Sequence, residues 1–180
     1  MKNPYLKSLA PALLLLIASC SKEPLTEFEP AKAPVTIALK DSVFTFDNPV
    51  DKALLLELIN DVRSKGCNCG DTFMAPAPAV TWNEKLEKAA WLHNKEMSDS
   101  SYVSHTGKNG SSAGDRIRKM GYNYKAYREN IAFGILTERT IIKGWMGSVT
   151  HCMAMMDPDM KETGIAKYQN FWTQELALHY

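Results

Sequence analysis

The chain lacks an excess of charge of either sign, because its 180 residues carry 21 basic and 20 acidic side chains. Nucleic-acid binding needs a basic face or stripe, so the near balance argues against a nucleic-acid partner. The sequence also lacks internal repeats, a phosphate-binding glycine loop and a GxSxG nucleophile elbow. Its four histidines include no HExxH pair, which excludes a thermolysin-like zinc site on spacing.

No hydrophobic run is long enough to span a bilayer as a helix. The longest, from about Leu9 to Ile17, has on the order of ten residues, whereas a spanning helix needs about 20. It follows two lysines and precedes small residues, so residues 1–19 are predicted to be an export signal. The end of this segment, LIASC, resembles the lipobox of bacterial lipoproteins, which predicts lipidation of Cys20. A plain secretory signal with an incidental cysteine is the alternative.

Residues 20–50 are rich in proline, glutamate and lysine, which predicts an extended tether behind the lipid anchor. The β-branched and aromatic residues within 35–46 suit either short strands in a hairpin-like flap or a continuation of the tether. The folded domain is predicted to cover residues 51–180, a length that suits one domain with a core. The residues after Cys20, SKEP, lack the aspartate common in inner-membrane lipoproteins and resemble a surface-export signal. We expect a lipid-anchored protein of the cell envelope, in the outer membrane and with the cell surface as the further option.

Within the domain, the pattern predicts helices first and strands last. Apolar side chains recur at helical spacing in four segments, and the last two segments alternate like strands around a Gln-Asn turn. The expected helices cover 51–66, 82–99, 111–122 and 137–149, and the expected strands cover 163–169 and 171–177. Asn83 is the expected N-cap of the second helix, and Thr137 begins the fourth. This order indicates the α+β class.

The histidines differ in their surroundings. His93 lies on the apolar face of its helix and is expected to be a hydrogen-bonded core residue. His179 is near the end of the chain and is expected to be solvated. His105 precedes a Gly/Asn/Ser loop, Glu129 stands just before an apolar strand-like stretch, and His151 follows the helix that contains Trp145. Each of these signals is weak alone.

Taken in order, the motifs resemble the bacterial branch of the CAP superfamily, which also contains the cysteine-rich secretory proteins, the antigen-5 venom allergens and the plant pathogenesis-related-1 proteins. The resemblance covers essentially all of residues 51–180 and rests on LLLELINDVRSKG, WNEKLEKAAWLHNKEM, SHTGKNGSSAGDRIRKMGY, RENIAFG, GWMGSVTHCMAMMDP, ETGIA and FWTQ. It implies an α-β-α sandwich, in which a central antiparallel sheet is flanked by helices and carries one cleft.

The resemblance also implies the cleft residues, since the family has two histidines and two glutamates there. His105, Glu129 and His151 match three of them, whereas the second glutamate falls at or near Ser148. A metal site of His105, His151 and Glu129 would suit zinc or another divalent cation, and a metal-free His–Glu–His cluster is the alternative. Glu129 is the candidate general base in a catalytic interpretation. Ala154 stands where the family typically has asparagine.

With Cys20 assigned to the lipid, Cys67, Cys69 and Cys152 remain, and in an exported protein a disulfide is expected. We prefer the pair Cys69–Cys152, with Cys67 as the alternative partner of Cys152. The odd count leaves one thiol. A zinc site of the same cysteines with His151 is a further alternative, and a nucleophilic Cys152–His pair has no evident orienting group.

The leading hypothesis is therefore a membrane-anchored extracytoplasmic binding module whose cleft takes a lipid, peptide, glycan or host molecule. The missing second carboxylate at Ser148 and the missing amide at Ala154 favour binding over catalysis. The second hypothesis is a divalent-metal-dependent hydrolase acting on peptides or cell-wall material. A structural or adhesion lipoprotein with a vestigial cleft is the third.

Overall fold

The computed structural model describes residues 45–180, so the predicted signal, Cys20 and the tether up to residue 44 lie outside the described residues. Of the strands expected within 35–46, only Thr45 and Phe46 are described, and neither is in a strand. The described elements are, in order, α1 (Lys52–Lys65), β1 (Cys67–Cys69), β2 (Thr72–Met74), β3 (Thr81–Trp82), α2 (Glu84–Asp99), α3 (Ala113–Lys119), β4 (Tyr124–Phe133), α4 (Glu138–Met146), α5 (Val149–Met156), β5 (Glu162–Tyr168) and β6 (Phe171–His179).

The main sheet has the strand order β3-β5-β6-β4, and β1 and β2 form a separate small hairpin. β5 and β6 pair in antiparallel fashion around the predicted Gln-Asn turn, and β4 pairs antiparallel to β6. The expectation of a wholly antiparallel sheet is corrected at one edge, because β3 pairs parallel to β5 through Thr81 and Trp82. Helices separate β3 from β5 in the chain, so no tight turn imposes an antiparallel pairing there. The predicted α+β fold is confirmed.

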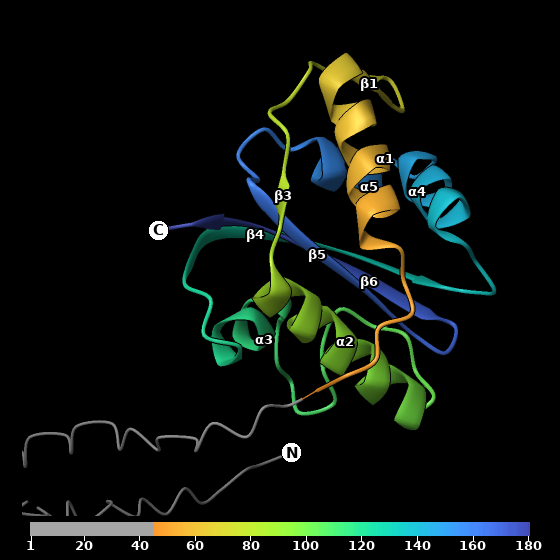
Figure 1. The fold of residues 1–180 in the computed structure, drawn as a ribbon, viewed down its shortest axis with the longest axis vertical. Helices are drawn as coiled ribbons and strands as arrows, with labels where there is room; N and C mark the ends of the chain where they lie inside the picture. The colour runs from red at the N-terminus through yellow and green to blue at the C-terminus, as the bar shows by residue number, and fades with distance from the viewer. Residues whose placement is uncertain (1–44) are drawn as a thin grey trace, which may run out of the picture. The chain divides into compact units, whose positions relative to one another are not determined.

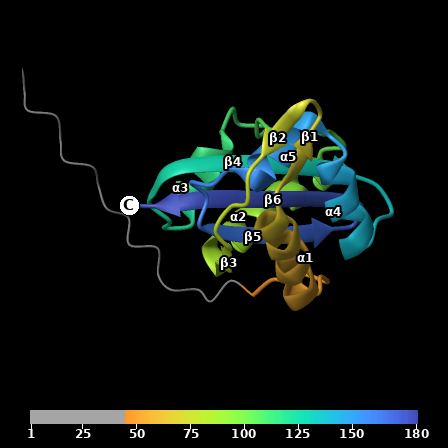
Figure 2. The ribbon, with the colours of Figure 1, turned by 90° about the horizontal axis from the view of Figure 1, so that it is seen from above.

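Helices cover both faces of this sheet. α2 and α3 lie on one side and α1, α4 and α5 on the other, as Figures 1 and 2 show. Trp172 and Leu176 of β6 pack into the core under α1, α4 and α5, whereas Ala177 packs with α2 and α3. A strand covered on both faces tolerates apolar residues at successive positions, which explains the nearly continuous burial of β6.

α2 lies unusually close to β5. Asn83 is its N-cap, as expected, and the Asn83 side chain accepts a hydrogen bond from the backbone N–H of Lys85 at 2.9 Å. A Cβ on Gly164 of β5 would lie only 2.1 Å from the backbone nitrogen of Glu87. Glycine at this position therefore allows the helix backbone to rest directly on the strand.

The segment expected to be a single helix over 137–149 is divided. α4 begins after the N-cap Thr137 and ends at Gly147, and α5 then begins at Val149. The buried guanidinium of Arg63, from α1, donates hydrogen bonds to the backbone carbonyls of Met155 and Met160 at 2.6 and 3.0 Å. These bonds hold the C-terminal end of α5 and so help to place the whole short helix.

The folded unit begins before the first helix. The ring of Phe46 packs on Trp91 with centroids 5.4 Å apart, and the indole N–H of Trp91 donates to the carbonyl of Asp47 at 2.8 Å. Asn48 donates a further hydrogen bond to the carbonyl of Ile165 at 2.9 Å. Within residues 45–180, no helix combines the length and apolar character needed to cross a membrane.

Candidate functional site

A groove of about 650 Å³ follows the outer edge of β4, which is the edge strand of the main sheet. We call it the β4 groove. It is lined by residues 124–129 of β4, together with residues from the loop before α3 and the start of that helix: His105, Thr106, Ser112 and Ala113. It therefore contains two of the residues expected from the sequence, His105 and Glu129.

Glu129 is buried at the inner end of the β4 groove, with only 4% of its side chain exposed. Nδ1 of His105 donates to one carboxylate oxygen of Glu129 at 2.7 Å, and the guanidinium of Arg116 from α3 donates to the other. Burial works to raise the pKa of Glu129, but the hydrogen bond from His105 and the charge of Arg116 outweigh it, so the pKa lies below its ordinary value. Glu129 is thus an ionised carboxylate with both oxygens engaged.

A second carboxyl group lies beside Glu129. Glu175 of β6 stands directly opposite Glu129 in the β4–β6 pairing, so both side chains point to the same face of the sheet. Glu175 is completely buried, and its burial and the charge of Glu129 raise its pKa well above the ordinary value. Within residues 45–180 neither carboxyl oxygen of Glu175 has a hydrogen-bond partner, so a protonated Glu175 avoids placing a second buried charge beside Glu129.

Glu175 and Arg116 are site residues that the sequence interpretation missed. A glutamate within the apolar strand segment FWTQELAL was the available signal for Glu175, because an unpaired charge is rarely placed among buried strand residues. No local pattern distinguished Arg116 from the neighbouring basic residues of its short helix. Its hydrogen bonds also reach the backbone carbonyls of His105 and Ser111, at 3.1 and 3.2 Å.

His151 belongs to the other helical layer, and in the described part of the chain its side chain makes no hydrogen bond to His105 or Glu129. It belongs to the first turn of α5, and its backbone carbonyl accepts a hydrogen bond from the side chain of Asn130 of β4 at 3.2 Å. Burial and the nearby charge of His105 lower the pKa of His151, whereas the hydrogen bond to Glu129 raises that of His105. The two imidazoles therefore have opposite protonation tendencies although they are neighbours.

Ser148 marks the start of α5 but does not join the polar network. Its hydroxyl lies 3.5 Å from that of Thr150 and makes no capping hydrogen bond to the helix. In residues 45–180 no hydrogen bond links Ser148 to His105, Glu129 or His151.

Within residues 45–180, His105, Glu129 and His151 do not place three potential ligand atoms within 4.8 Å of one another, and the carboxylate of Glu129 is bonded to His105 and Arg116. The Nδ1–H of His105 is directed at Glu129, which leaves Nε2 of His105 for a metal, and a carboxylate behind a histidine is the usual second partner of a metal ligand. His151 is the second available imidazole. Among the described residues, only Cys67, Cys69 and Cys152 place three potential ligand atoms within 4.8 Å of one another.

The sulfur cluster lies beside this site. A disulfide joins Cys69 of β1 to Cys152 of α5, which is the pairing preferred from the sequence. It ties the β1–β2 hairpin to the helix that contains His151. The free thiol of Cys67 lies 3.8 Å from the sulfur of Cys152, and burial raises the pKa of Cys67. The disulfide occupies two of the three sulfurs, so the geometry does not favour the cysteine zinc site.

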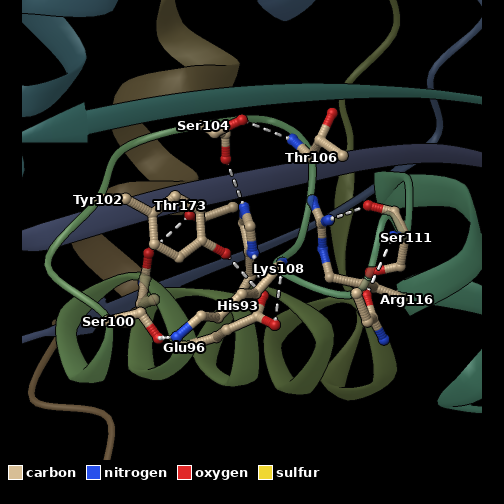
Figure 3. Close-up of polar contacts among 12 residues, drawn as sticks. His93, Glu96, Ser100, Tyr102, Ser104, Thr106, Lys108, Ser111, Arg116 and Thr173 are labelled. Carbon is tan, nitrogen blue, oxygen red and sulfur yellow. Dashed lines mark hydrogen bonds and ion pairs between the residues drawn. The ribbon is translucent and has the colours of Figure 1, made fainter.

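The loop that contains His105 is anchored on α2 through His93. The ring of His93 is completely buried, and its Nε2 donates to the carbonyl of Ser104 at 2.8 Å. Glu96, one helical turn later, accepts hydrogen bonds from the hydroxyl of Tyr102 and the backbone N–H of Lys108 at 2.9 and 3.2 Å. Figure 3 shows the loop arching over His93. His93 is thus a core residue, as expected, and it fixes the loop.

Comparison with protein families places these residues in context. Residues 56–177 match the model of the CAP family, described as the cysteine-rich secretory protein family. Among curated proteins, the uncharacterized protein YkwD of Bacillus subtilis (strain 168) is 30% identical over 95 residues, which are 52% of this chain and 37% of YkwD. The uncharacterized membrane protein YlbC of the same organism is 26% identical over 95 residues, 53% of this chain and 28% of YlbC. The chain thus spans well under half of either relative.

Solved structures show the same fold at low sequence identity. An extracellular SCP-domain protein from Bacillus anthracis superposes with a TM-score of 0.62 and 24% identity, covering 70% of this chain and 39% of the other. An outer surface protein from Borrelia burgdorferi superposes with a TM-score of 0.60 and 20% identity, covering 71% of this chain and 92% of the other.

Proposed function

Because the chain belongs to the cysteine-rich secretory protein (CAP) family, we propose that it is a binding module that acts outside the cytoplasm and is held at a membrane by a lipid on Cys20. The proposed location is supported by the lipobox-like LIASC segment. It is also supported by the structural similarity to an extracellular protein and to an outer surface protein. We place the anchor in the outer membrane, as the residues after Cys20 suggest.

The observation that carries the binding proposal is the state of Glu129. A general base must reach the proton that it removes, and its pKa must be high enough to take that proton; the pKa of Glu129 is lowered instead. Both oxygens of Glu129 already accept hydrogen bonds, from His105 and Arg116, and the side chain is almost completely buried. Glu129 therefore serves to orient His105, whose side chain is 63% exposed and faces the ligand side.

The position of the β4 groove favours a peptide among the ligand classes considered. Within residues 45–180, β4 pairs with no strand other than β6, so its other edge is not covered by a strand and can bind an extended chain. Peptides commonly bind by adding a strand to such an edge, with side chains entering neighbouring pockets. Tyr124 and Tyr127, whose rings pack edge to face at 4.8 Å, would contact the peptide side chains.

Binding is tested with the purified full-length protein and four separate probes: a random-sequence peptide library, peptidoglycan fragments, phospholipid vesicles and a glycan array. We expect retention of peptides, and a loss of about tenfold in affinity for His105→Ala, equivalent to about 1.4 kcal/mol. Lys143→Ala, an exposed change on α4, is the control and should bind like the wild type. If the protein retains lipids or glycans but no peptides, the assignment of a peptide ligand is rejected. Cleavage of the bound peptides would reject a pure binding role.

The second candidate is a divalent-metal-dependent hydrolase, and the hydrogen bond from His105 to Glu129 is the observation that favours it. His105 and His151 would hold the cation, with Glu129 supporting His105 from behind. A bound zinc ion would supply Lewis acidity. The protein residues would bind and orient the substrate along β4. Metal analysis after incubation with zinc distinguishes the candidates: less than about a tenth of an equivalent, with no peptide hydrolysis, rejects the hydrolase.

The anchor has its own test. Cys20→Ala removes the only sulfur that the predicted lipobox provides for acylation. Because multiple acyl chains are needed for stable membrane attachment, the variant should move from the membrane fraction to the soluble fraction. The full-length protein should in turn gain the mass of its acyl groups. A wild-type protein that is soluble and unmodified would reject the anchor without affecting the binding proposal.

A further inference from the structure

A second cavity, separate from the β4 groove, lies between α2 and α3 beneath the loop that precedes α3. It has a volume of about 380 Å³ and shares no lining residue with the β4 groove. We call it the α2–α3 cavity. The residues that matter here are two apolar ones, Leu92 and Met120, and four polar ones, Asn109, Ser111, Arg116 and Lys119.

At this cavity, two basic side chains carry N–H groups that have no acceptor in the described part of the chain. Arg116 is 8% exposed and uses its terminal nitrogens for Glu129 and two backbone carbonyls, yet its Nε–H finds no acceptor in the described part of the chain. Buried polar groups are almost always paired, so an unpaired one points to a partner that the chain itself does not supply. Lys119 is exposed at the cavity, and within residues 45–180 it forms no hydrogen bond or ion pair.

The acidic residues of the cavity are already engaged. Glu96 accepts from Tyr102 and from the backbone of Lys108, as Figure 3 shows. Asp115 accepts the backbone N–H and the hydroxyl of Ser112 at 3.0 and 2.7 Å within a capping box. Neither carboxylate pairs with Arg116 Nε–H or with Lys119, so within the described residues these two basic side chains keep N–H donors for a ligand oxygen from outside the chain.

One unpaired acceptor accompanies these donors. Nε2 of His93 donates to the carbonyl of Ser104, and burial lowers the pKa of His93, so Nδ1 carries a lone pair. This Nδ1 is buried and has no hydrogen-bond donor among residues 45–180, and a carboxylate oxygen of Glu96 lies 3.5 Å from it. A ligand N–H would satisfy it.

We propose that the α2–α3 cavity binds an α-carboxylate with an amide N–H on the adjacent carbon: an N-acyl amino acid or the carboxy-terminal residue of a peptide. The carboxylate pairs with Arg116 and Lys119, and the amide N–H with His93. The acyl oxygen meets Asn109 and Ser111, while an apolar side chain rests on Leu92 and Met120. The cavity has the size expected of a small-molecule site. Occupation requires a small opening of the loop, since the unpaired nitrogens are shielded from solvent.

The test uses the purified full-length protein and two matched probes, N-acetyl-leucine and its neutral amide, N-acetyl-leucinamide. Binding is followed by calorimetry and by the NMR signals of the His93 ring and the Arg116 Nε–H. We expect N-acetyl-leucine to bind at least about tenfold more tightly than the amide, because only the carboxylate pairs with both cations. A five-residue peptide that ends in leucine distinguishes the two sources: equal binding assigns a peptide terminus, and its exclusion assigns a free N-acyl amino acid.

Two charge-reversal variants complete the test. Lys119→Glu should weaken the binding of N-acetyl-leucine by at least about tenfold. Lys143→Glu makes the same charge change at an exposed residue of α4 and should leave the affinity unchanged. Both lysines are exposed, and unchanged unfolding midpoints would verify that the variants fold. No saturable binding up to about 50 mM, equal binding of the amide, or equal effects of the two variants would overturn the proposal. None of these readouts depends on a ligand in the β4 groove.

Discussion

Replacing Gly164 by alanine probes the contact on which the whole α2 layer rests. The added Cβ would lie 2.1 Å from the backbone nitrogen of Glu87 and 2.6 Å from the carbonyl carbon of Leu86. Non-bonded heavy atoms are most stable at about 3.5–4.0 Å, so α2 would have to retreat by more than about 1 Å. Both neighbours are backbone atoms, and no side-chain rotation can relieve the overlap.

The cost of this displacement can be bounded. Overpacking costs about 1–3 kcal/mol where side chains can adjust, and a gap of about 1 Å removes up to about half of each dispersion contact of the displaced helix. α2 buries Leu86, Ala90 and Met97 completely. We therefore expect Gly164→Ala to lower the free energy of unfolding by at least about 3 kcal/mol. Urea unfolding with the disulfide intact, followed by tryptophan fluorescence, measures it.

Gly144→Ala is the matched control, and for this variant we expect the free energy of unfolding to rise. Gly144 is an exposed residue of α4, and a Cβ there would have no neighbouring atom within 4 Å. Alanine in a helix interior is more stable than glycine by about 0.5–1 kcal/mol, because the unfolded chain loses freedom. A Gly164→Ala protein within about 0.5 kcal/mol of the wild type would refute the close approach of α2 to β5. Equal losses in both variants would attribute the effect to glycine replacement in general.

Three further predictions concern the site. In the Cys69→Ser variant, Cys67 should form the disulfide with Cys152, whose sulfur lies 3.8 Å away. The intact mass should then be lower than that of the reduced protein by two hydrogens. Free thiols at both Cys67 and Cys152 would contradict this. Glu175→Gln should raise the free energy of unfolding at pH 7 and flatten the decline of that free energy above pH 4.5. The raised pKa keeps the carboxyl of Glu175 protonated in the folded protein while it ionises in the unfolded chain, which costs about 1.4 kcal/mol per pKa unit. Unfolding measured at several pH values would show the same slope for both proteins if the reasoning fails. The pKa of His105 in the folded protein, measured by NMR, should lie above 6.5. The stability from its ion pair with Glu129 is therefore present below pH 6.5 and is lost as the pH rises through the pKa of the folded protein. A pKa below 6.5 would contradict the pairing.

Much of the fold was predictable because the relevant signals are local. The N-caps Asn83 and Thr137, the final pair of strands and the burial of His93 all follow from short stretches of sequence. Resemblance to the family then gave His105 and Glu129 as neighbours, and the structure joins them by a hydrogen bond.

The remaining features depend on contacts between segments that are distant in the chain. Local sequence does not reveal which residue of β6 faces Glu129, since that depends on the register of two strands separated by two helices and a third strand. For the same reason the charged partner of Glu129 was missed, because Arg116 reaches it only when α3 folds against β4. The parallel pairing of β3 likewise reflects where the chain enters the sheet.

The sequence by itself determined the first three helices, the N-caps of α2 and α4 and the alternation of the last strands, because each rests on spacing within one segment, and the order of several motifs indicated the family. The tertiary structure decided the chemistry of the site. It placed Glu175 beside Glu129, inserted Arg116 between the β4 groove and the α2–α3 cavity, and selected Cys69 rather than Cys67 for the disulfide. Two cysteines on one strand are locally equivalent, and only the orientation of the hairpin against α5 distinguishes them.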